Sequence, residues 1–508
     1  MEETISEIQL PDHWAWVELK DLTENPKNDI VDGPFGSNLK SNEFIEVGIP
    51  VFKIQNIKEN RFVDKNINFV SPTKAEELSR HSFQKGDLII TKLGNPLGLC
   101  CKVPEKYPYG IIVADLMRFR PSTRRVVVQY LMYGINSVIV QNQFKAITKG
   151  TTRPRVNLTI VRGIKFPFPP LPEQRAIVSK IEQLFSELDN GIANLKLAQE
   201  QLKVYRQAVL KKAFEGELTK KWREQQRDLP DAEELLEQIR KEREEAAKKS
   251  GKKLKSINSL TEVKLSNLPK GWKWTRLGNL VEEPKYGTSK KCDYNINGIG
   301  VLRIPNISDG LINDSDLKFA QFDSTEIENY HLKAGDILTI RSNGSVDLVG
   351  KCALVSTKDE KHLYAGYLIR LRPISPLINS KYLLNCLSSI DLRYQIESKA
   401  KSTSGVNNIN SGELQSLIIP FCSLPEQQAI VQEIETRLSV CDKIEQDIET
   451  NLEKAEALRQ SILKKAFEGK LLNERELAEV RGAEDWEPAE VLLERIKAEK
   501  AQNGKKIH

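Results

Sequence analysis

An internal repeat constrains the fold of this 508-residue chain more than any other feature of its sequence. Residues 171–218 recur at 424–471 without a gap, and 22 of the 48 aligned positions are identical. The segments that precede the two copies also resemble each other: LPDHWAW at 10–16 corresponds to LPKGWKW at 268–274. Because a repeated sequence folds into a repeated structural unit, we predict a tandem duplication with an internal pseudo-twofold repeat.

Each well-matched segment is predicted to be one long helix of a coiled coil. Apolar residues recur every seven positions: Ile181, Leu188, Leu195, Leu202 and Val209 in the first copy, and Ile434, Cys441, Ile448, Ala455 and Ile462 in the second. Five heptads with charged flanks favour helix-on-helix packing over a stripe that packs only on its own domain. Pro172 and Pro425 suit the first turn of each helix, and Gly216 and Gly469 suit the C-terminal end.

The two helices are near-copies in one chain, so the simplest partner of each helix is the other. Helices related by a pseudo-twofold axis across the pair must run antiparallel, which predicts one globular domain at each end. About 44 residues at 1.5 Å per residue give a spacer of roughly 66 Å.

The segments before the helices combine short apolar strands with helical stretches, which predicts mixed α/β domains. Strands are expected at 51–54, 87–92, 116–119, 301–304, 336–341 and 368–371, and helices at 126–140 and 380–397. The fold class is therefore α+β: two mixed α/β domains (1–170 and 268–423) separated by two long helices that form an antiparallel coiled coil. The other expected segments are a helical spacer with a charged extension (171–250), a linker (251–267), a second helical spacer (424–472) and a charged helical tail (473–508).

Charge and cysteine content narrow the functional class. The net charge of +6 is modest, but residues 116–172 hold ten basic residues and no Asp or Glu, which favours a nucleic-acid partner over an ordinary solvated face. The seven cysteines form no C-x-x-C pair and there are only five histidines, so neither a zinc ribbon nor a disulfide framework is expected. With no secretory signal or membrane span predicted, we expect a cytoplasmic protein.

The chain contains no recognisable catalytic motif. It has no Asn-Pro-Pro-aromatic or Asp-Pro-Pro-Tyr string of an adenine methyltransferase, and no G-x-x-x-x-G-K-[ST] phosphate loop. A nuclease-like Glu-x-Lys triplet occurs at 283–285, but such triplets arise by chance in any charged chain. We therefore predict that the isolated chain is not an enzyme, holds no metal and has no catalytic residue.

The layout resembles the DNA-specificity subunit of type I restriction–modification systems. The similarity rests on the repeated LPEQ-x-A-I-V entries, the KKAFEG ends and the proline-rich approach at 166–170, and it covers nearly the whole chain. The resemblance implies two target-recognition domains that each read one half of a bipartite asymmetric site in double-stranded DNA. It also implies two copies of a methylation subunit on the helices and two copies of a restriction/translocation subunit in the full complex. S-adenosylmethionine, ATP and magnesium are then expected on partner subunits, and no cofactor on this chain.

Base-reading residues are expected on loops after equivalent strands and on the polar approach to each helix. In the first domain the nominated residues are Lys53, Gln55, Asn56, Lys92, Asn95, Thr151, Thr152, Arg153, Arg155 and Asn157. In the second domain they are Arg303, Asn306, Arg341, Asn343, Lys401, Ser402, Thr403, Asn407 and Asn408. Arg and Lys suit guanine, Asn and Gln suit adenine, and other members of the set are expected to contact phosphates.

Identical residues outside the apolar stripe are predicted to bind a shared partner twice, since core packing does not require them. These residues are Glu182, Ser186, Asp189, Gln207 and Lys211, with Glu435, Ser439, Asp442, Gln460 and Lys464 in the second copy. The alternative is a duplication too recent for them to have diverged. Two other functions stay open: a stand-alone coiled-coil DNA-binding regulator or scaffold, and an enzyme that acts alone.

Overall fold

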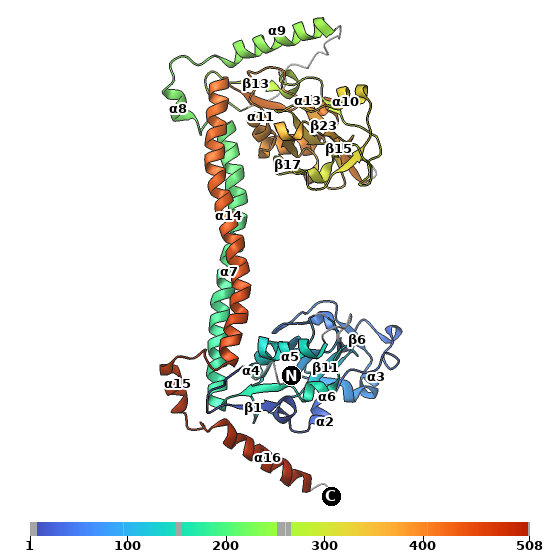
Figure 1. The fold of residues 1–508 in the computed structure, drawn as a ribbon, viewed down its shortest axis with the longest axis vertical. Coiled ribbons are helices and arrows are strands. Elements are labelled where there is room, and N and C mark those ends of the chain that lie inside the picture. The colour runs from blue at the N-terminus through green and yellow to red at the C-terminus, as the bar shows by residue number, and fades with distance from the viewer. Residues whose placement is uncertain are drawn as a thin grey trace. The chain divides into compact units, whose positions relative to one another are not determined.

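The computed structural model describes residues 8–94, 96–148, 155–250, 260, 266–403 and 405–505. The chain divides into two compact units, Met1–Leu195 with Glu449–His508, and Lys196–Ile448. Each unit contains one mixed α/β domain together with one half of each long helix (Figure 1). The predicted duplication is therefore present in the fold.

The domain of the first unit contains two four-stranded sheets. One has the antiparallel order β2 (Ile30–Asp32), β11 (Leu116–Phe119), β8 (Leu88–Thr91) and β9 (Cys100–Lys102). The other has the order β6 (Asn68–Val70), β3 (Ile49–Phe52), β10 (Tyr109–Ile112) and β7 (Ser82–Gln84), in which β3 and β10 are parallel. Strands β8 and β11 are buried along their whole length, which explains their nearly continuous apolar sequences.

The domain of the second unit repeats this topology. Its larger sheet has the order β14 (Lys285–Tyr286), β23 (Leu368–Leu371), β19 (Ile337–Ile340) and β21 (Cys352–Leu354). Its second sheet has the order β18 (Lys318–Ala320), β15 (Ile299–Leu302) and β22 (Leu363–Tyr364), again with a parallel pair, β15 with β22. The expected strands are confirmed, with ends that differ by at most two residues.

The predicted helices within the domains are each broken in two. Residues 126–140 contain α4 (Val128–Asn136) and the start of α5 (Val138–Thr148), separated at Ser137. Residues 380–397 contain α11 (Ser380–Leu387) and α12 (Ile390–Lys399). At both breaks a serine hydroxyl, of Ser137 or Ser389, donates to a carbonyl three residues earlier, a local bond that ends a helix in place of the next turn.

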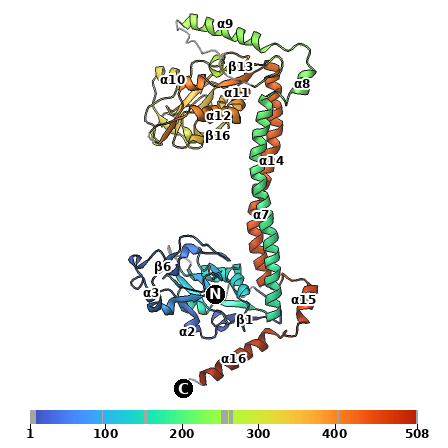
Figure 2. The same cartoon turned by 180° about the vertical axis from the view of Figure 1, so that it is seen from behind.

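The two long helices are confirmed as an antiparallel coiled coil. Helices α7 (Leu171–Phe214) and α14 (Leu424–Phe467) each contain 44 residues and lie side by side in both views (Figures 1 and 2). In the first unit Asp189 of α7 pairs with Arg459 of α14. In the second unit Arg206 of α7 binds Asp442 and Glu445 of α14 at 2.7 and 2.8 Å. The early half of one helix therefore packs on the late half of the other.

The repeated Leu-Pro-Glu-Gln motif anchors each domain to the start of its helix. Glu173 is buried, accepts a hydrogen bond from Trp14 Nε1 at 3.0 Å and lies 2.8 Å from His13 Nε2. The side-chain oxygen of Gln174 accepts from the Val127 amide at 2.9 Å, and its nitrogen donates to the Pro169 carbonyl at 2.9 Å. The motif therefore ties the domain's N-terminus, helix α4 and the approach strand to one helix end.

The second unit uses the same motif in the same way. Glu426 accepts from Trp272 Nε1 at 2.8 Å, from Thr219 Oγ1 at 2.9 Å and from Arg223 Nε at 2.7 Å. Gln427 accepts from the Asn379 amide at 2.9 Å and donates to the Cys422 carbonyl at 2.9 Å. The LP-x-x-W segments at 10–14 and 268–272 are thus matched because their tryptophans bind the buried glutamates.

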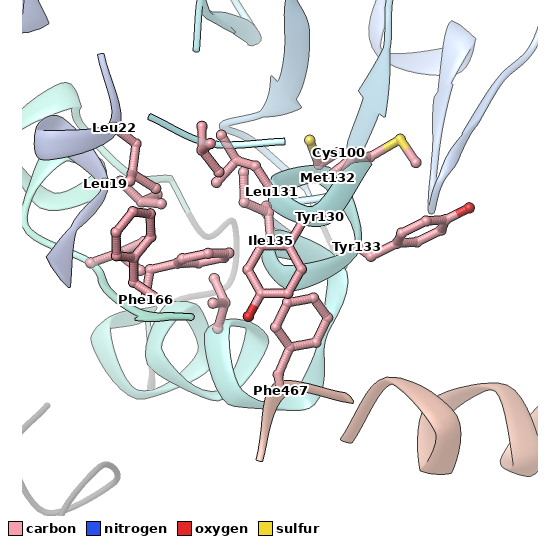
Figure 3. Packing of buried hydrophobic residues seen from close by; sticks show 14 of the residues in the cluster. Leu19, Leu22, Cys100, Tyr130, Leu131, Met132, Tyr133, Ile135, Phe166 and Phe467 are labelled. Atoms are coloured by element: carbon pink, nitrogen blue, oxygen red, sulfur yellow. The ribbon is translucent and has the colours of Figure 1, made fainter. Parts of the chain in front are cut away.

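The repeated KKAFEG ends close the core of each unit. Phe467 of α14 packs against Tyr130 of α4 (Figure 3). The ring centroids of these two residues are 4.8 Å apart, and the Phe467 ring lies 6.0 Å from that of Phe166. A Cβ at Gly134 would lie 2.3 Å from the Phe166 ring, so only glycine fits beneath this cluster. In the second unit Phe214 packs against Tyr382 at 5.4 Å.

The glycines at the helix ends are required by both conformation and space. Gly216 and Gly469 have φ of 76° and 72°, the left-handed conformation that ends a helix. A Cβ on Gly216 would lie 2.4 Å from Pro269, and one on Gly469 would lie 2.4 Å from Pro11. Each helix end therefore packs against the Leu-Pro segment that opens a domain.

The charged segments after the two helices also correspond to each other. The first contains α8 (Lys220–Glu224) and α9 (Ala232–Ser250), and the second contains α15 (Glu474–Arg481) and α16 (Ala489–Lys505). Ala232 donates its amide to the Gly271 carbonyl at 3.0 Å, and Ala489 donates to the His13 carbonyl at 3.2 Å. The charged extension after the first long helix is helical in two pieces, because α8 ends before Pro230 and α9 begins after it.

Candidate nucleic-acid interface and helix surface

The acid-free segment 116–172 is not a free basic surface, which corrects the expectation drawn from its charge. Arg118 is buried and donates to the carbonyls of Ser82 and Asn28, and burial lowers its pKa. Arg120 makes two 2.8 Å bonds to the buried Asp87, and these bonds raise the arginine's pKa. Arg162 donates to the carbonyls of Pro26 and Ile30. These cations hold the domain together with acceptors from elsewhere in the chain.

Two nominated asparagines are structural, which corrects their assignment as base readers. Asn56 and Asn306 are 0% and 1% exposed. Asn56 accepts from the Lys53 amide and donates to the carbonyls of Val63 and Lys65 at 3.0 and 2.9 Å. Asn306 accepts from the Arg303 amide and donates to two carbonyls at 2.8 Å. With all amide bonds made inside the loop, neither side chain has a donor left for DNA.

The described nominees of the first domain lie around the ends of β3 and β8. Lys53 lies 5.2 Å above the Phe44 ring, and Gln55 is exposed at the same turn. Lys92 forms a 2.9 Å ion pair with Asp32. Arg155 is exposed and pairs loosely with Asp115 at 3.7 Å, and it lies beside Leu93 in an isolated bridge.

The remaining nominees of this domain are a helix cap and four residues outside the described part of the chain. Asn157 accepts from the Ile160 amide at 2.9 Å and so begins α6 (Leu158–Arg162). Asn95, Thr151, Thr152 and Arg153 lie outside the described residues.

The nominees of the second domain gather on one three-stranded sheet and the adjoining end of β19. The sheet has the order β20 (Ser342–Asn343), β25 (Val406–Asn408) and β24 (Lys401–Thr403). Asn343 pairs with Asn407 and Lys401 with Asn408 in this register, and Ser402 and Thr403 continue β24. Arg341 precedes β20 directly, and its carbonyl accepts from the Ile409 amide at 2.9 Å. The structure therefore brings these sequence-distant residues together, although only the backbone of 401–403 is described.

Beside this sheet the second domain has a cavity of about 660 Å³, whose lining is basic and aromatic. Four cations line it, Lys290, Arg303, Lys318 and Arg341, and no Asp or Glu is among its described lining residues. Tyr286 and Tyr367 lie at the same cavity and are 37% and 62% exposed. The sequence reasoning missed both tyrosines, Lys290 and Lys318; aromatic residues among basic ones were the available signal.

Four of the ten identical helix residues are engaged within the chain, which changes their interpretation. Asp189 and Asp442 bind arginines of the opposite helix, Glu435 binds Lys381 of the domain at 2.6 Å, and Gln460 donates to Glu59 at 2.6 Å. The premise that only an external partner would preserve these positions is therefore wrong for these four, because contacts inside each unit also use them.

The other six residues of this set retain surface for a partner to different degrees. Glu182, Ser186 and Ser439 are exposed, and Gln207 is half-buried with an unpartnered side-chain oxygen. Lys211 and Lys464 are exposed, with only weak contacts of 3.9 and 3.8 Å to the glutamates one turn later.

The coil also exposes several large apolar residues. In the second unit Leu197, Val204 and Tyr205 of α7 and Val440 and Ile444 of α14 are 41–71% exposed. No helix among the described residues is sufficiently long and apolar to cross a membrane. The same residues contain no grouping of His, Cys, Asp and Glu that could bind a metal ion.

Comparison with known proteins identifies the family. A model described as the type I restriction modification DNA specificity domain matches the chain twice, at residues 11–197 and 269–454. The type I restriction enzyme StySPI specificity subunit of Salmonella potsdam is 25% identical over 503 residues, 98% of each chain. The EcoKI specificity subunit of Escherichia coli K12 is 26% identical over 464 residues, 90% of each chain.

Solved structures share the fold. A chain from a structure of complex assembly and conformational transition of the type I R-M system superposes with a TM-score of 0.63 at 19% identity, covering 91% of this chain and 100% of that one. The HsdS subunit from Thermoanaerobacter tengcongensis superposes with a TM-score of 0.55 at 20% identity, covering 92% of this chain and 100% of that one.

Proposed function

Because the chain belongs to the type I restriction–modification DNA specificity family, we propose that it directs a methylation and restriction complex to a bipartite asymmetric DNA site. The observation that carries this proposal is the double match of the family model, once over each domain and the adjoining helix. Each domain is anchored by an equivalent buried glutamate, Glu173 or Glu426, but the two domains carry different surface residues. They are therefore suited to read two different half-sites. Catalysis belongs to partner subunits, which supply the sites for S-adenosylmethionine, ATP and magnesium, and we expect the complex to act in the cytoplasm.

Each domain is proposed to contact DNA through the residues at the ends of β3 and β8, or of β15 and β19. The nominees with described side chains that stay proposed as DNA contacts are Lys53, Gln55, Lys92 and Arg155 in the first domain and Arg303, Arg341, Asn343, Asn407 and Asn408 in the second. Of these, Lys92 and Arg303 each form an ion pair with an aspartate of their own domain. Asn95, Thr151, Thr152, Arg153, Lys401, Ser402 and Thr403 remain proposed from the sequence alone.

The coil is proposed to bind two methylation subunits, and two restriction/translocation subunits join in the full complex. The exposed apolar residues of the second unit and the lysines Lys211 and Lys464 are the proposed contact surface, with Glu182, Ser186, Ser439 and Gln207 beside them. Charge reversal of Lys211 and Lys464 together should reduce assembly while circular dichroism shows the helices intact. Unchanged stoichiometry in mass photometry would contradict this surface.

The decisive experiment is methylome sequencing of cells that express the chain with its methylation subunit. We expect modified adenines in two half-sites whose centres lie about 10 base pairs apart on one face of the duplex, with an unread gap of about 6 or 7 pairs. Replacing residues 1–170 by another family member's first domain should change one half-site and keep the gap. An insertion of about one helical turn in both helices should lengthen the gap. A contiguous site, or two changed half-sites after one domain swap, would refute this function.

Binding and activity assays on the purified chain, without a methylation subunit, separate the two alternatives. A stand-alone regulator or scaffold would bind its specific site without a methylation subunit, and an enzyme acting alone would turn over as a purified chain. We expect neither result.

A further inference from the structure

We propose that Arg341 reads a guanine in the half-site of the second domain, and that Tyr286 is the positioning residue that holds the Arg341 guanidinium for this contact. The inference rests on the proposed DNA-binding function and deepens it by naming the base and the pair of residues that read it.

The strand register shows which residues occupy the matching places in the first domain. Asp32 of β2 lies opposite Met117 of β11, and Tyr286 of β14 lies opposite Ile369 of β23. Gly33 and Gly287 follow, and a Cβ on either would lie 2.0–2.2 Å from a backbone carbonyl oxygen, so these two turns have the same backbone approach. Asp32 therefore corresponds to Tyr286.

The cations correspond by the same argument. Thr91 lies opposite Leu116 at the end of β8, and Ile340 lies opposite Leu368 at the end of β19. Lys92 and Arg341 are the next residues. In the first domain Asp32 binds Lys92 at 2.9 Å and neutralises it. In the second domain an aromatic ring takes the place of the carboxylate, so Arg341 has no counterpart of Asp32 to offset its charge.

Three interactions position Arg341: one involves its guanidinium, one fixes the Tyr286 ring, and one involves the Arg341 backbone. Its guanidinium lies 4.7 Å from the centre of the Tyr286 ring. The Tyr286 hydroxyl accepts a hydrogen bond from the Ser411 amide at 3.0 Å, which fixes the ring. The Arg341 amide donates to the Tyr367 carbonyl at 2.9 Å. Stacking and fixed backbone bonds limit the rotamers of the side chain before any ligand arrives.

The donors of this guanidinium are unused within the described part of the chain. No ion pair or hydrogen bond joins the Arg341 side chain to a described residue, and its Nε is buried without a partner. The neighbouring cations Lys290 and Arg303 are bound to Glu326 and Asp316 at 2.7 and 3.2 Å. The Arg341 guanidinium is thus preorganised at an open cavity and is not paired with a described carboxylate. The paired N–H donors of a guanidinium match the O6 and N7 acceptors of guanine.

The test uses the complete complex of this chain with its methylation subunit and duplexes in which each base pair of the second half-site is varied. The wild-type complex should prefer guanine at one position by roughly 5- to 150-fold, the range for a bidentate contact. Arg341→Ala should remove the preference at that position and keep it at the others. Arg341→Lys should retain charge but lose most of the preference. Tyr286→Leu should weaken the preference at the same position, whereas a merely structural role would affect all positions alike.

Lys318→Ala is the matched control from the same cavity, where Lys318 lies 4.9 Å from the Tyr294 ring. It should lower affinity equally for all sequences and reduce the salt dependence by about one phosphate contact. The same uniform loss with Arg341→Ala would overturn the proposal, because it would make Arg341 a phosphate contact. Unchanged binding, or a second half-site without a guanine-dependent position, would also overturn it. If the wild-type complex showed no sequence preference at any position, that result would instead refute the proposed function itself.

Discussion

Replacing the buried glutamate of the second Leu-Pro-Glu-Gln motif should loosen the second unit selectively. In Glu426→Ala the Arg223 guanidinium loses its 2.7 Å partner, and Trp272 and Thr219 lose their acceptor. Breaking a buried ion pair costs about 3–5 kcal/mol, and an orphaned buried donor about 1–3 kcal/mol. Because Arg223 is 18% exposed and water can reach it, we take the low end of the range for the ion pair and for each of the two orphaned donors, and expect a loss of about 5 kcal/mol.

Native-state hydrogen exchange measured by mass spectrometry tests this prediction, because it reports the opening of each unit separately. Amides of β13 (Lys273–Arg276) and β26 (Ile418–Phe421) should exchange roughly 4,000-fold faster in Glu426→Ala, the equivalent of about 5 kcal/mol. Amides of β1 (Ala15–Glu18) and β12 (Lys165–Phe168) should not change. Glu426→Gln keeps an oxygen for Trp272 and should cost about 1–2 kcal/mol.

Glu173→Ala is the matched control, since Glu173 binds Trp14 and His13 in the first unit. It should accelerate exchange in β1 and β12 and leave β13 and β26 unchanged. Equal effects of either substitution on both units, or no effect of either, would refute the reasoning that each motif anchors one domain.

Three further predictions concern the first unit. Phe467→Ala removes a ring packed on Tyr130 and Phe166 and should destabilise the unit by about 3–5 kcal/mol in urea unfolding; a loss below about 1 kcal/mol would contradict this packing. Gly469→Ala places a Cβ 2.4 Å from Pro11 at a φ of 72° and should cost about 2–4 kcal/mol in the same assay, whereas the open Gly191→Ala should not destabilise. Burial raises the pKa of Glu59 despite the hydrogen bond from Gln460, so its charged form opposes folding above that pKa and protonation relieves the cost as pH falls. Glu59→Gln should therefore raise the melting temperature at pH 7 and change it less near pH 4; an equal shift at both values would show that the effect is not the charge.

The pattern of apolar residues and repeats was sufficient to predict the coiled coil, the duplication and the family. Heptad spacing depends only on local helix geometry, and Gly216 and Gly469 end the helices through their own backbone conformation. The strands β11 and β23 begin and end at the predicted residues, because both are short buried runs in which every residue but one arginine is apolar.

The functional surface depended on contacts that the sequence does not specify. Asn56 and Arg118 look like nucleic-acid ligands in the sequence, yet the fold buries both and satisfies them with backbone carbonyls. Lys92 and Arg341 occupy equivalent places, and only the pairing of β2 with β11 and of β14 with β23 brings Asp32 to one and Tyr286 to the other. The sequence alone therefore determined the two long helices of the coiled coil and the internal repeat, which follow from short-range periodicity. The tertiary structure decided which cations remain free to bind a ligand, because neutralisation depends on residues brought together from distant parts of the chain.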